Sequence, residues 1–184
     1  MKFTPQSIPE VVLIEPAIHS DNRGYFVETF RQDVFEEELG FQVSFIQDNE
    51  SKYTKGVLRG LHYQLPPYTQ AKLARVIKGS VLDVAVDIRK SSPTFGQHVS
   101  VELTEENKHQ LFVPHGFAHG FVVLSDSATF AYKVDNYYAP EHDRGIAFDD
   151  VKLGIDWRLA LEKLQLSDKD KVHPNLCNAI DLFE

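Results

Sequence analysis

The sequence predicts a mostly antiparallel β-sandwich or barrel with a few short helices. From about residue 43 onward, short runs of β-forming residues are separated by turn residues, a pattern typical of antiparallel sheets rather than of alternating strands and helices. Residues 81–88 alternate with the period of two that a strand requires. The chain has 184 residues, enough for one well-buried domain, so we expect residues 1–184 to form a single domain.

Two short helices are expected, one before the strands and one after them. Asp33 can cap a helix over 34–39, and Gly40 can end it because glycine readily adopts the left-handed conformation of a helix end. Residues 157–164 are expected to form the second helical segment.

The strand pattern is clearest over residues 73–88. Lys78-Gly79-Ser80 separates two apolar runs, which predicts a hairpin turn between paired strands. Within 81–88, Asp83 and Asp87 lie on one face. The opposite face carries four aliphatic side chains, those of Leu82, Val84, Val86 and Ile88. We therefore expect one apolar and one solvated face.

The remaining strands follow at short intervals. Apolar residues alternate at Val99, Val101 and Leu103, and again over 128–134. Two continuous apolar runs, 111–113 and 121–124, predict buried strands.

Composition excludes several classes of function. A net charge of -8 argues against general affinity for nucleic acids, whose phosphates would be repelled. No apolar run reaches the ~20 residues needed to cross a bilayer, and residues 1–5 do not resemble a secretory signal, so neither a membrane partner nor secretion is expected. The single cysteine, Cys177, fits a reducing cytoplasm.

Residues 114–120 have the pattern P-x-G-x-x-H, which resembles the second motif of cupin barrels and implies a cupin-type jelly roll. In metal-binding cupins the final histidine, here His119, is a ligand together with an H-x-H pair. The matching segment reads His62-Tyr63-Gln64, and a glutamine amide is a poor ligand for a transition metal. We therefore expect no metal, and with no glycine-rich dinucleotide loop we expect no cofactor.

Three residue types in this chain suit proton transfer beside a carbonyl group. His62 can remove a proton, Lys72 can stabilise the enolate charge, and Tyr132 can return a proton. Taken singly, a lysine is usually a surface residue, and an inward-facing tyrosine or histidine usually belongs to the core.

Seven segments, in this order along nearly the whole chain, resemble the cofactor-independent dTDP-4-dehydrorhamnose 3,5-epimerase family. They are residues 21–26, 47–49, 57–62, 84–89, 114–120, 136–138 and 167–170. The resemblance implies that a dTDP-sugar, dTDP-4-dehydro-6-deoxy-D-glucose, is epimerised at C3 and C5 to give dTDP-4-dehydro-L-rhamnose. It also implies a homodimer, which composition does not show.

The resemblance assigns catalytic roles to four residues. His62 matches the base, Asp170 the carboxylate paired with it, Lys72 the enolate-stabilising lysine and Tyr132 the acid on the opposite face of the sugar. Without the resemblance, Ser167 and Asp170 would be interpreted as a helix-capping pair. Arg59 and His62 would face opposite ways in a regular strand, so a bulge at Gly60 is expected.

The resemblance also assigns residues to the binding of the nucleotide sugar. Arginine suits a diphosphate, and an aromatic ring suits the thymine base, which the family stacks on the residue matching Tyr138. Exposed arginines otherwise often form only solvated ion pairs. The other matching residues are Arg23, Glu28, Gln47, Asp48, Asn49, Arg59, His119, Asp143 and Lys169.

Two alternatives remain open at the level of sequence. One is a relative that inverts only C3 or only C5 of a related dTDP-4-keto-deoxysugar, since it would use the same base, carboxylate and lysine. The other is a non-catalytic cupin that binds a sugar nucleotide or a metal.

Overall fold

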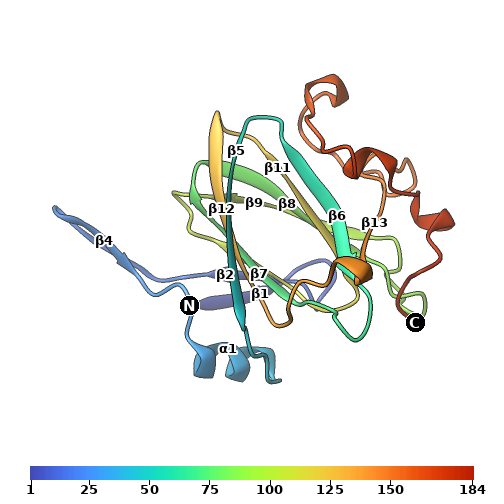
Figure 1. The fold of residues 1–184 in the computed structure, drawn as a ribbon. Coiled ribbons are helices and arrows are strands. Elements are labelled where there is room, and N and C mark those ends of the chain that lie inside the picture. The colour runs from blue at the N-terminus through green and yellow to red at the C-terminus, as the bar shows by residue number, and fades with distance from the viewer.

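The computed structural model describes residues 1–184, which fold into two antiparallel sheets packed face to face (Figure 1). The six-stranded sheet contains, in spatial order, β1 (Lys2–Pro5), β2 (Val12–Glu15), β10 (Gln110–Val113), β7 (Lys72–Lys78), β12 (Ser127–Val134) and β5 (Gln47–Thr54). The five-stranded sheet contains β13 (Asp143–Gly145), β6 (Leu58–Gln64), β11 (Phe117–Val123), β8 (Ser80–Asp87) and β9 (His98–Thr104). The predicted antiparallel sandwich is confirmed, including the strands over 99–103, 111–113, 121–123 and 128–134.

A separate hairpin and a short helix precede the sandwich strands. Strands β3 (Ile18–Asp21) and β4 (Gly24–Val27) pair only with each other and project away from the body of the molecule (Figure 1). Helix α1 (Gln32–Leu39) follows them. Gly40 ends this helix in the left-handed conformation, as predicted, and its N–H donates to the carbonyl oxygen of Glu36.

The predicted cap of this helix is wrong. The N-cap residue is Arg31, and Asp33 lies inside the first turn. The Asp33 carboxylate accepts hydrogen bonds from the Arg31 guanidinium and from the N–H of Val34, so it is already engaged by its neighbours. The predicted helix over 157–164 is also largely wrong, because only a single 3₁₀ turn, Leu161–Lys163, forms there.

The predicted hairpin at Gly79 is wrong as well, because β7 and β8 belong to different sheets. Gly79 has φ +78°, and a Cβ there would overlap the backbone of Ser127. The glycine therefore allows the chain to cross from one layer to the other in a single residue.

Both faces of β8 are buried, so the expectation of one solvated face is also wrong. Val81 and Ala85 belong to the core between the sheets. Leu82, Val84 and Val86 pack on the opposite face, with Trp157, Leu176 and other residues of the segment after β13. That segment covers the outer face of the five-stranded sheet (orange to red in Figure 1). Its remaining 3₁₀ turns are Asp170–Val172 and Leu176–Asn178, and a further one, Pro140–His142, precedes β13.

No helix in the structure is long and apolar enough to cross a membrane.

Candidate functional site

The site is a pair of adjoining hollows between the two sheets. One has a volume of about 240 Å³ and the other about 280 Å³. Both are lined by Arg59, His62, Lys72 and Tyr132. The three residues selected for proton-transfer chemistry therefore meet at one place, which we call the central cavity.

A bulge in β6 places Arg59 and His62 on the same wall of this cavity. Arg59 lies opposite Phe121, and His62 lies opposite His119, so β6 contains one residue more than β11 between the two pairs. The extra residue falls at Gly60, which has φ +122° and lies so close to Gly120 that a Cβ would overlap it. The predicted bulge is confirmed, and it needs glycine at this position.

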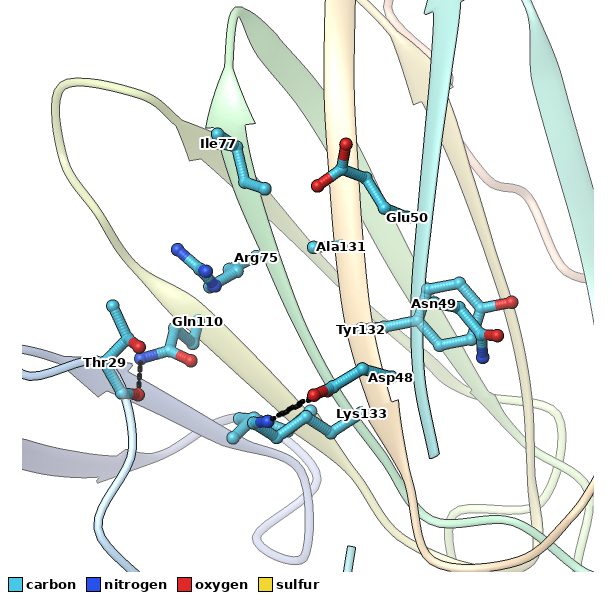
Figure 2. A pocket seen from close by; sticks show the side chains of 11 residues that line it. Thr29, Asp48, Asn49, Glu50, Arg75, Ile77, Gln110, Ala131, Tyr132 and Lys133 are labelled. Atoms are coloured by element: carbon cyan, nitrogen blue, oxygen red, sulfur yellow. Dashed lines mark hydrogen bonds and ion pairs between the residues drawn. The ribbon is translucent and has the colours of Figure 1, made fainter. Parts of the chain in front are cut away.

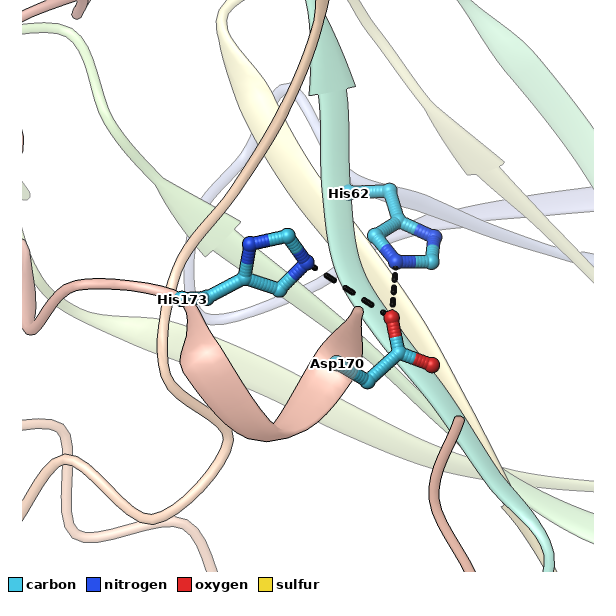
Figure 3. Close-up of side chains that lie close together, drawn as sticks. All are labelled: His62, Asp170 and His173. Atoms are coloured by element: carbon cyan, nitrogen blue, oxygen red, sulfur yellow. Dashed lines mark hydrogen bonds and ion pairs between the residues drawn. The ribbon is translucent and has the colours of Figure 1, made fainter. Parts of the chain in front are cut away.

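His62 forms a close pair with a carboxylate that lies 108 residues later in the chain. Its Nε2 lies 2.5 Å from Oδ1 of Asp170, and the second ring nitrogen points away from that carboxylate (Figure 3). Asp170 is buried, whereas the His62 side chain is 23% exposed. The pair therefore leaves one imidazole nitrogen available to a ligand in the cavity.

A hydrogen bond joins Ser167 to Asp170, but Ser167 is not the cap of the 3₁₀ turn, whose N-cap residue is Lys169 and has no side-chain cap. Ser167 Oγ accepts a hydrogen bond of 3.2 Å from the backbone N–H of Asp170 at the start of the 3₁₀ turn. That interaction uses the backbone of Asp170 and leaves its carboxylate free to contact His62. The capping interpretation of Ser167 and Asp170 is therefore wrong, and the structure pairs the Asp170 carboxylate with His62.

Charge and burial favour a neutral imidazole beside an ionised carboxylate. Burial lowers the pKa of His62, although the neighbouring Asp170 opposes this shift. Burial also works to raise the pKa of Asp170, but its contacts with His173 and His62 outweigh burial and hold that pKa well below its ordinary value. A free imidazole that is oriented by a carboxylate is the form that a general base requires.

Lys72 and Tyr132 face His62 from the other sheet, on β7 and β12. Burial lowers the pKa of Lys72 to about 8, although Asp143 and Asp83 oppose the shift, so the ammonium form still dominates at neutral pH. Burial raises the pKa of Tyr132, against the opposing charge of Arg59, so the phenol keeps its proton. An imidazole on one wall thus faces a phenol and an ammonium group on the other.

His119 forms a second buried imidazole–carboxylate pair in the central cavity. Its Nε2 lies 2.7 Å from Oδ1 of Asp83, and both side chains are almost fully buried. This contact explains why Asp83 can lie on an interior face, because a buried carboxylate requires a hydrogen-bonding partner.

Several of the other predicted binding residues border the same hollows. Tyr138, Asp143 and Lys169 line one hollow, and Asn49 lines the other. The Tyr138 hydroxyl donates to Asp143 over 3.2 Å, and Lys169 forms an ion pair with the same carboxylate. Gln47 lies on the inward-facing side of β5, and its side-chain amide donates to Asn49 over 2.8 Å.

Three predicted binding residues do not reach the central cavity of this chain. Arg23 lies at the tip of the projecting hairpin, 85% exposed and paired with Asp21, and Glu28 is exposed just after that hairpin. Asp48 points to the outer face of the six-stranded sheet and forms an ion pair with Lys133 over 2.9 Å (Figure 2). It borders a separate hollow of about 260 Å³. Strand parity explains this result for Asp48, because consecutive residues of β5 face opposite sides.

The sequence did not single out His173, which lies beside Asp170. With His62 and Asp170 it places three possible metal-ligand atoms within 4.8 Å of one another. The geometry does not suit a metal ion, because two ligands of one tetrahedral zinc lie about 3.3 Å apart, whereas His62 and Asp170 are separated by 2.5 Å. That separation fits a shared proton instead. A histidine three residues after an aspartate carries no distinctive sequence signal, so only the fold identifies it.

Comparison with known proteins gives a consistent result. Residues 5–178 match the family described as dTDP-4-dehydrorhamnose 3,5-epimerase. Enzymes of that name from Shigella flexneri and Pseudomonas aeruginosa are 56% and 53% identical to the chain. The first alignment covers 92% of this chain and 93% of the relative, and the second covers 93% of each.

Solved structures of similar enzymes share the fold. A dTDP-6-deoxy-D-glucose-3,5-epimerase from Legionella pneumophila, in complex with dTDP-4-keto-L-rhamnose, superposes with a TM-score of 0.93 at 52% identity, covering 98% of this chain and 94% of that one. A 3′-monoepimerase from Streptomyces bikiniensis, in complex with dTDP-quinovose, superposes with a TM-score of 0.90 at 37% identity, covering 95% and 88%. The predicted cupin-like fold is confirmed by these neighbours.

Proposed function

The chain belongs to the dTDP-4-dehydrorhamnose 3,5-epimerase family, and we propose that it inverts C3 and C5 of dTDP-4-dehydro-6-deoxy-D-glucose in dTDP-L-rhamnose biosynthesis. The protein is thus an isomerase. One observation supports the proposal above all: His62 and Tyr132 line the same cavity from opposite sheets, as removal and return of a proton on opposite faces of a sugar ring require.

Each inversion proceeds through an enolate of the 4-keto group. The carbonyl acidifies the C–H bonds at both neighbouring carbons, and His62 takes one proton with the ring nitrogen that does not contact Asp170. The electron pair moves onto the carbonyl oxygen, where the Lys72 ammonium stabilises the negative charge. Tyr132 then donates its proton to the same carbon from the other face, which leaves His62 protonated and Tyr132 as a phenolate. Proton exchange with water restores both groups, and a second cycle inverts the other carbon. The substrate is neither oxidised nor reduced.

Binding of the nucleotide end is assigned to the polar rim of the cavity. We propose that Tyr138 stacks on thymine, since its ring is 57% exposed beside the hollow that His62 lines. Arg59 and Lys169 provide positive charge at the same hollow for the diphosphate.

A single-carbon epimerase is the alternative within this fold, since the 3′-monoepimerase neighbour has nearly the same backbone. The higher identity to 3,5-epimerases favours inversion at both carbons. The test is to incubate the protein with the 4-keto sugar nucleotide in heavy water and to follow C3 and C5 separately by NMR. Deuterium entry and inversion at both carbons are expected, and inversion at one carbon only would establish the alternative.

Prolonged treatment with a strong chelator should leave the epimerisation rate unchanged. Gln64 donates its side-chain amide to the carbonyl oxygens of Tyr68 and Tyr137, so it faces its own chain rather than a metal site. Activity that is lost to the chelator and restored by a divalent cation would contradict a reaction carried by His62, Lys72 and Tyr132 alone.

We further propose that the protein acts as a homodimer in the cytoplasm, where the exposed and unpaired Cys177 would stay reduced. The projecting hairpin exposes Tyr25 and Phe26, 58% and 68% accessible, and carries Arg23 away from its own cavity. A second copy would bury these rings and bring Arg23 to a substrate site. We expect sedimentation of the full-length chain to give the mass of a dimer. Deletion of residues 18–27 should give monomers that bind dTDP more weakly. A full-length chain that sediments as a monomer would contradict the proposal.

A further inference from the structure

A second imidazole borders the carboxylate that orients His62, and the mechanism above does not use it. His173 follows the 3₁₀ turn that starts at Asp170, and only 9% of its side chain is exposed. Its Nε2 lies 3.6 Å from Oδ1 of Asp170, the same oxygen that His62 approaches at 2.5 Å (Figure 3). The two imidazole rings meet edge to face, with their centroids 5.6 Å apart.

The position of this ring depends on a glycine in the strand next to His62. Gly145 of β13 is the cross-strand partner of His62. A Cβ at Gly145 would overlap the His173 imidazole, so the missing side chain creates the space that the ring fills. Just beyond the ring, the carbonyl oxygen of Pro174 accepts a hydrogen bond of 2.9 Å from the N–H of Ala147. The ring is thus held against Asp170 by contacts on the strand side and by the chain that follows.

Asp170 is the only ion-pair partner of the His173 side chain. Nε2 of His173 and Oδ2 of Asp170 are both buried without a hydrogen bond. A buried polar atom without a partner is costly, so an N–H at this nitrogen is directed to the Asp170 carboxylate. The 3.6 Å separation is longer than a hydrogen bond, and catalytic hydrogen bonds of this kind commonly tighten when substrate binds.

We infer that His173 is a positioning residue whose Nε2–H is directed to Oδ1 of Asp170, the oxygen that also contacts His62. Through this contact His173 sets how strongly the carboxylate stabilises a proton on His62. The inference rests on the proposed function. An N–H donor withdraws negative charge from the carboxylate, which disfavours the imidazolium form of His62 and keeps this base free at lower pH. Arg59 of β6 places its Nε 3.7 Å from Oδ2 of Asp170. The other charged or titratable groups around the pair are Lys72 from β7, His119 from β11, Tyr132 from β12, Asp143 and Arg144 from β13, Tyr138 and Lys169 on the rim, and Asp181 and Tyr63 beside His173.

The first test compares two substitutions of His173. His173→Ala removes the donor, so the pKa of His62 should rise and the acid limb of the kcat profile should move to higher pH by about half to one unit, the effect of one hydrogen bond. The plateau value of kcat should stay within a few-fold of the original and KM should be unchanged, because His62 is still present and is then the stronger base. His173→Gln keeps an N–H donor at a similar reach and does not titrate, so its profile should match that of the unsubstituted protein.

A second test moves the ring without changing it. Gly145→Ala should displace the imidazole and raise the pKa of His62 as His173→Ala does. The double variant should show no additional shift, because both substitutions remove the same contact. Val172→Ala is the matched control in the same turn, since that side chain is 78% exposed, and its profile should be unchanged.

NMR titration of the His62 ring separates this inference from the proposed function, since it measures the pKa of His62 without turnover. A higher pKa in His173→Ala and in Gly145→Ala, restored in His173→Gln, supports the inference even if the unsubstituted protein fails to invert the sugar. An unchanged pKa in a folded His173→Ala variant would overturn it. Equal behaviour of the alanine and glutamine variants would also overturn it, because a donor role requires them to differ.

Discussion

His62→Asn is expected to lower kcat by about 10²- to 10⁴-fold, the usual contribution of a general base, or more, because asparagine cannot take the proton from C3 or C5. The substitution keeps a side-chain N–H donor and a polar group beside Asp170, so the fold should persist. Affinity for dTDP should remain within a few-fold of the original, since the nucleotide is held by the rim rather than by the base. Steady-state rates and equilibrium binding of dTDP measure the two effects separately.

The control for this substitution is His109→Asn. His109 lies outside the central cavity, and its imidazole is 3.9 Å from the carboxylate of Glu15. Its substitution should leave kcat and dTDP affinity unchanged. A His62→Asn enzyme that works at the rate of this control would remove His62 from the mechanism.

The same site predicts how the rate depends on pH. Burial places the pKa of His62 below its ordinary value, so the free-base form persists into mildly acidic solution. The rate should therefore stay constant around neutral pH and fall as the pH drops through that lowered pKa. His62→Asn should lose this acid limb.

Tyr132→Phe is expected to separate proton exchange from inversion. The phenylalanine ring keeps the packing of Tyr132 against Phe130, whose centroid lies 6.0 Å away, and only the hydroxyl is lost. His62 can still form the enolate, but no acid remains on the opposite wall of the cavity. In heavy water, a deuteron exchanged onto His62 returns to the face from which the proton came. Deuterium should therefore enter with the starting configuration retained, while inversion falls by about 10²-fold or more.

Two further variants define what this result means. Lys72→Ala should slow exchange and inversion together, because it weakens stabilisation of the enolate that both processes require. Tyr137→Phe, at a ring that is 62% exposed, should behave like the unsubstituted protein. Equal losses of exchange and inversion in Tyr132→Phe would mean that the tyrosine assists enolate formation, and its assignment as the acid would have to be abandoned.

The sequence determined the class of fold and several of the residues that line the central cavity. Apolar residues alternate over 81–88, 99–103 and 128–134, and this alternation predicted strands. The structure confirms strands over these segments. The family was also predictable, because its motifs occur in order along the chain, and residues 5–178 match the family. Local patterns of this kind suffice to predict strands, because the backbone geometry of a strand alone decides which side chains share a face over a few residues.

Only the tertiary structure decided which faces pack and which distant residues meet. Alternation with a period of two does not show whether a second layer covers the polar face of a strand. Asp83 and Asp87 were therefore expected to be solvated, whereas both are buried. Likewise, a glycine between two apolar runs can turn a hairpin or change sheets, and Gly79 does the latter because β7 pairs with β10 and β12.

The His62–Asp170 contact spans 108 residues and depends on how the C-terminal segment lies against β6. His173 reaches the same carboxylate only because Gly145 leaves space for its ring. Contacts of this kind are set by the packing of side chains between elements that are distant in sequence. A linear pattern carries no information about them until the layers are in place.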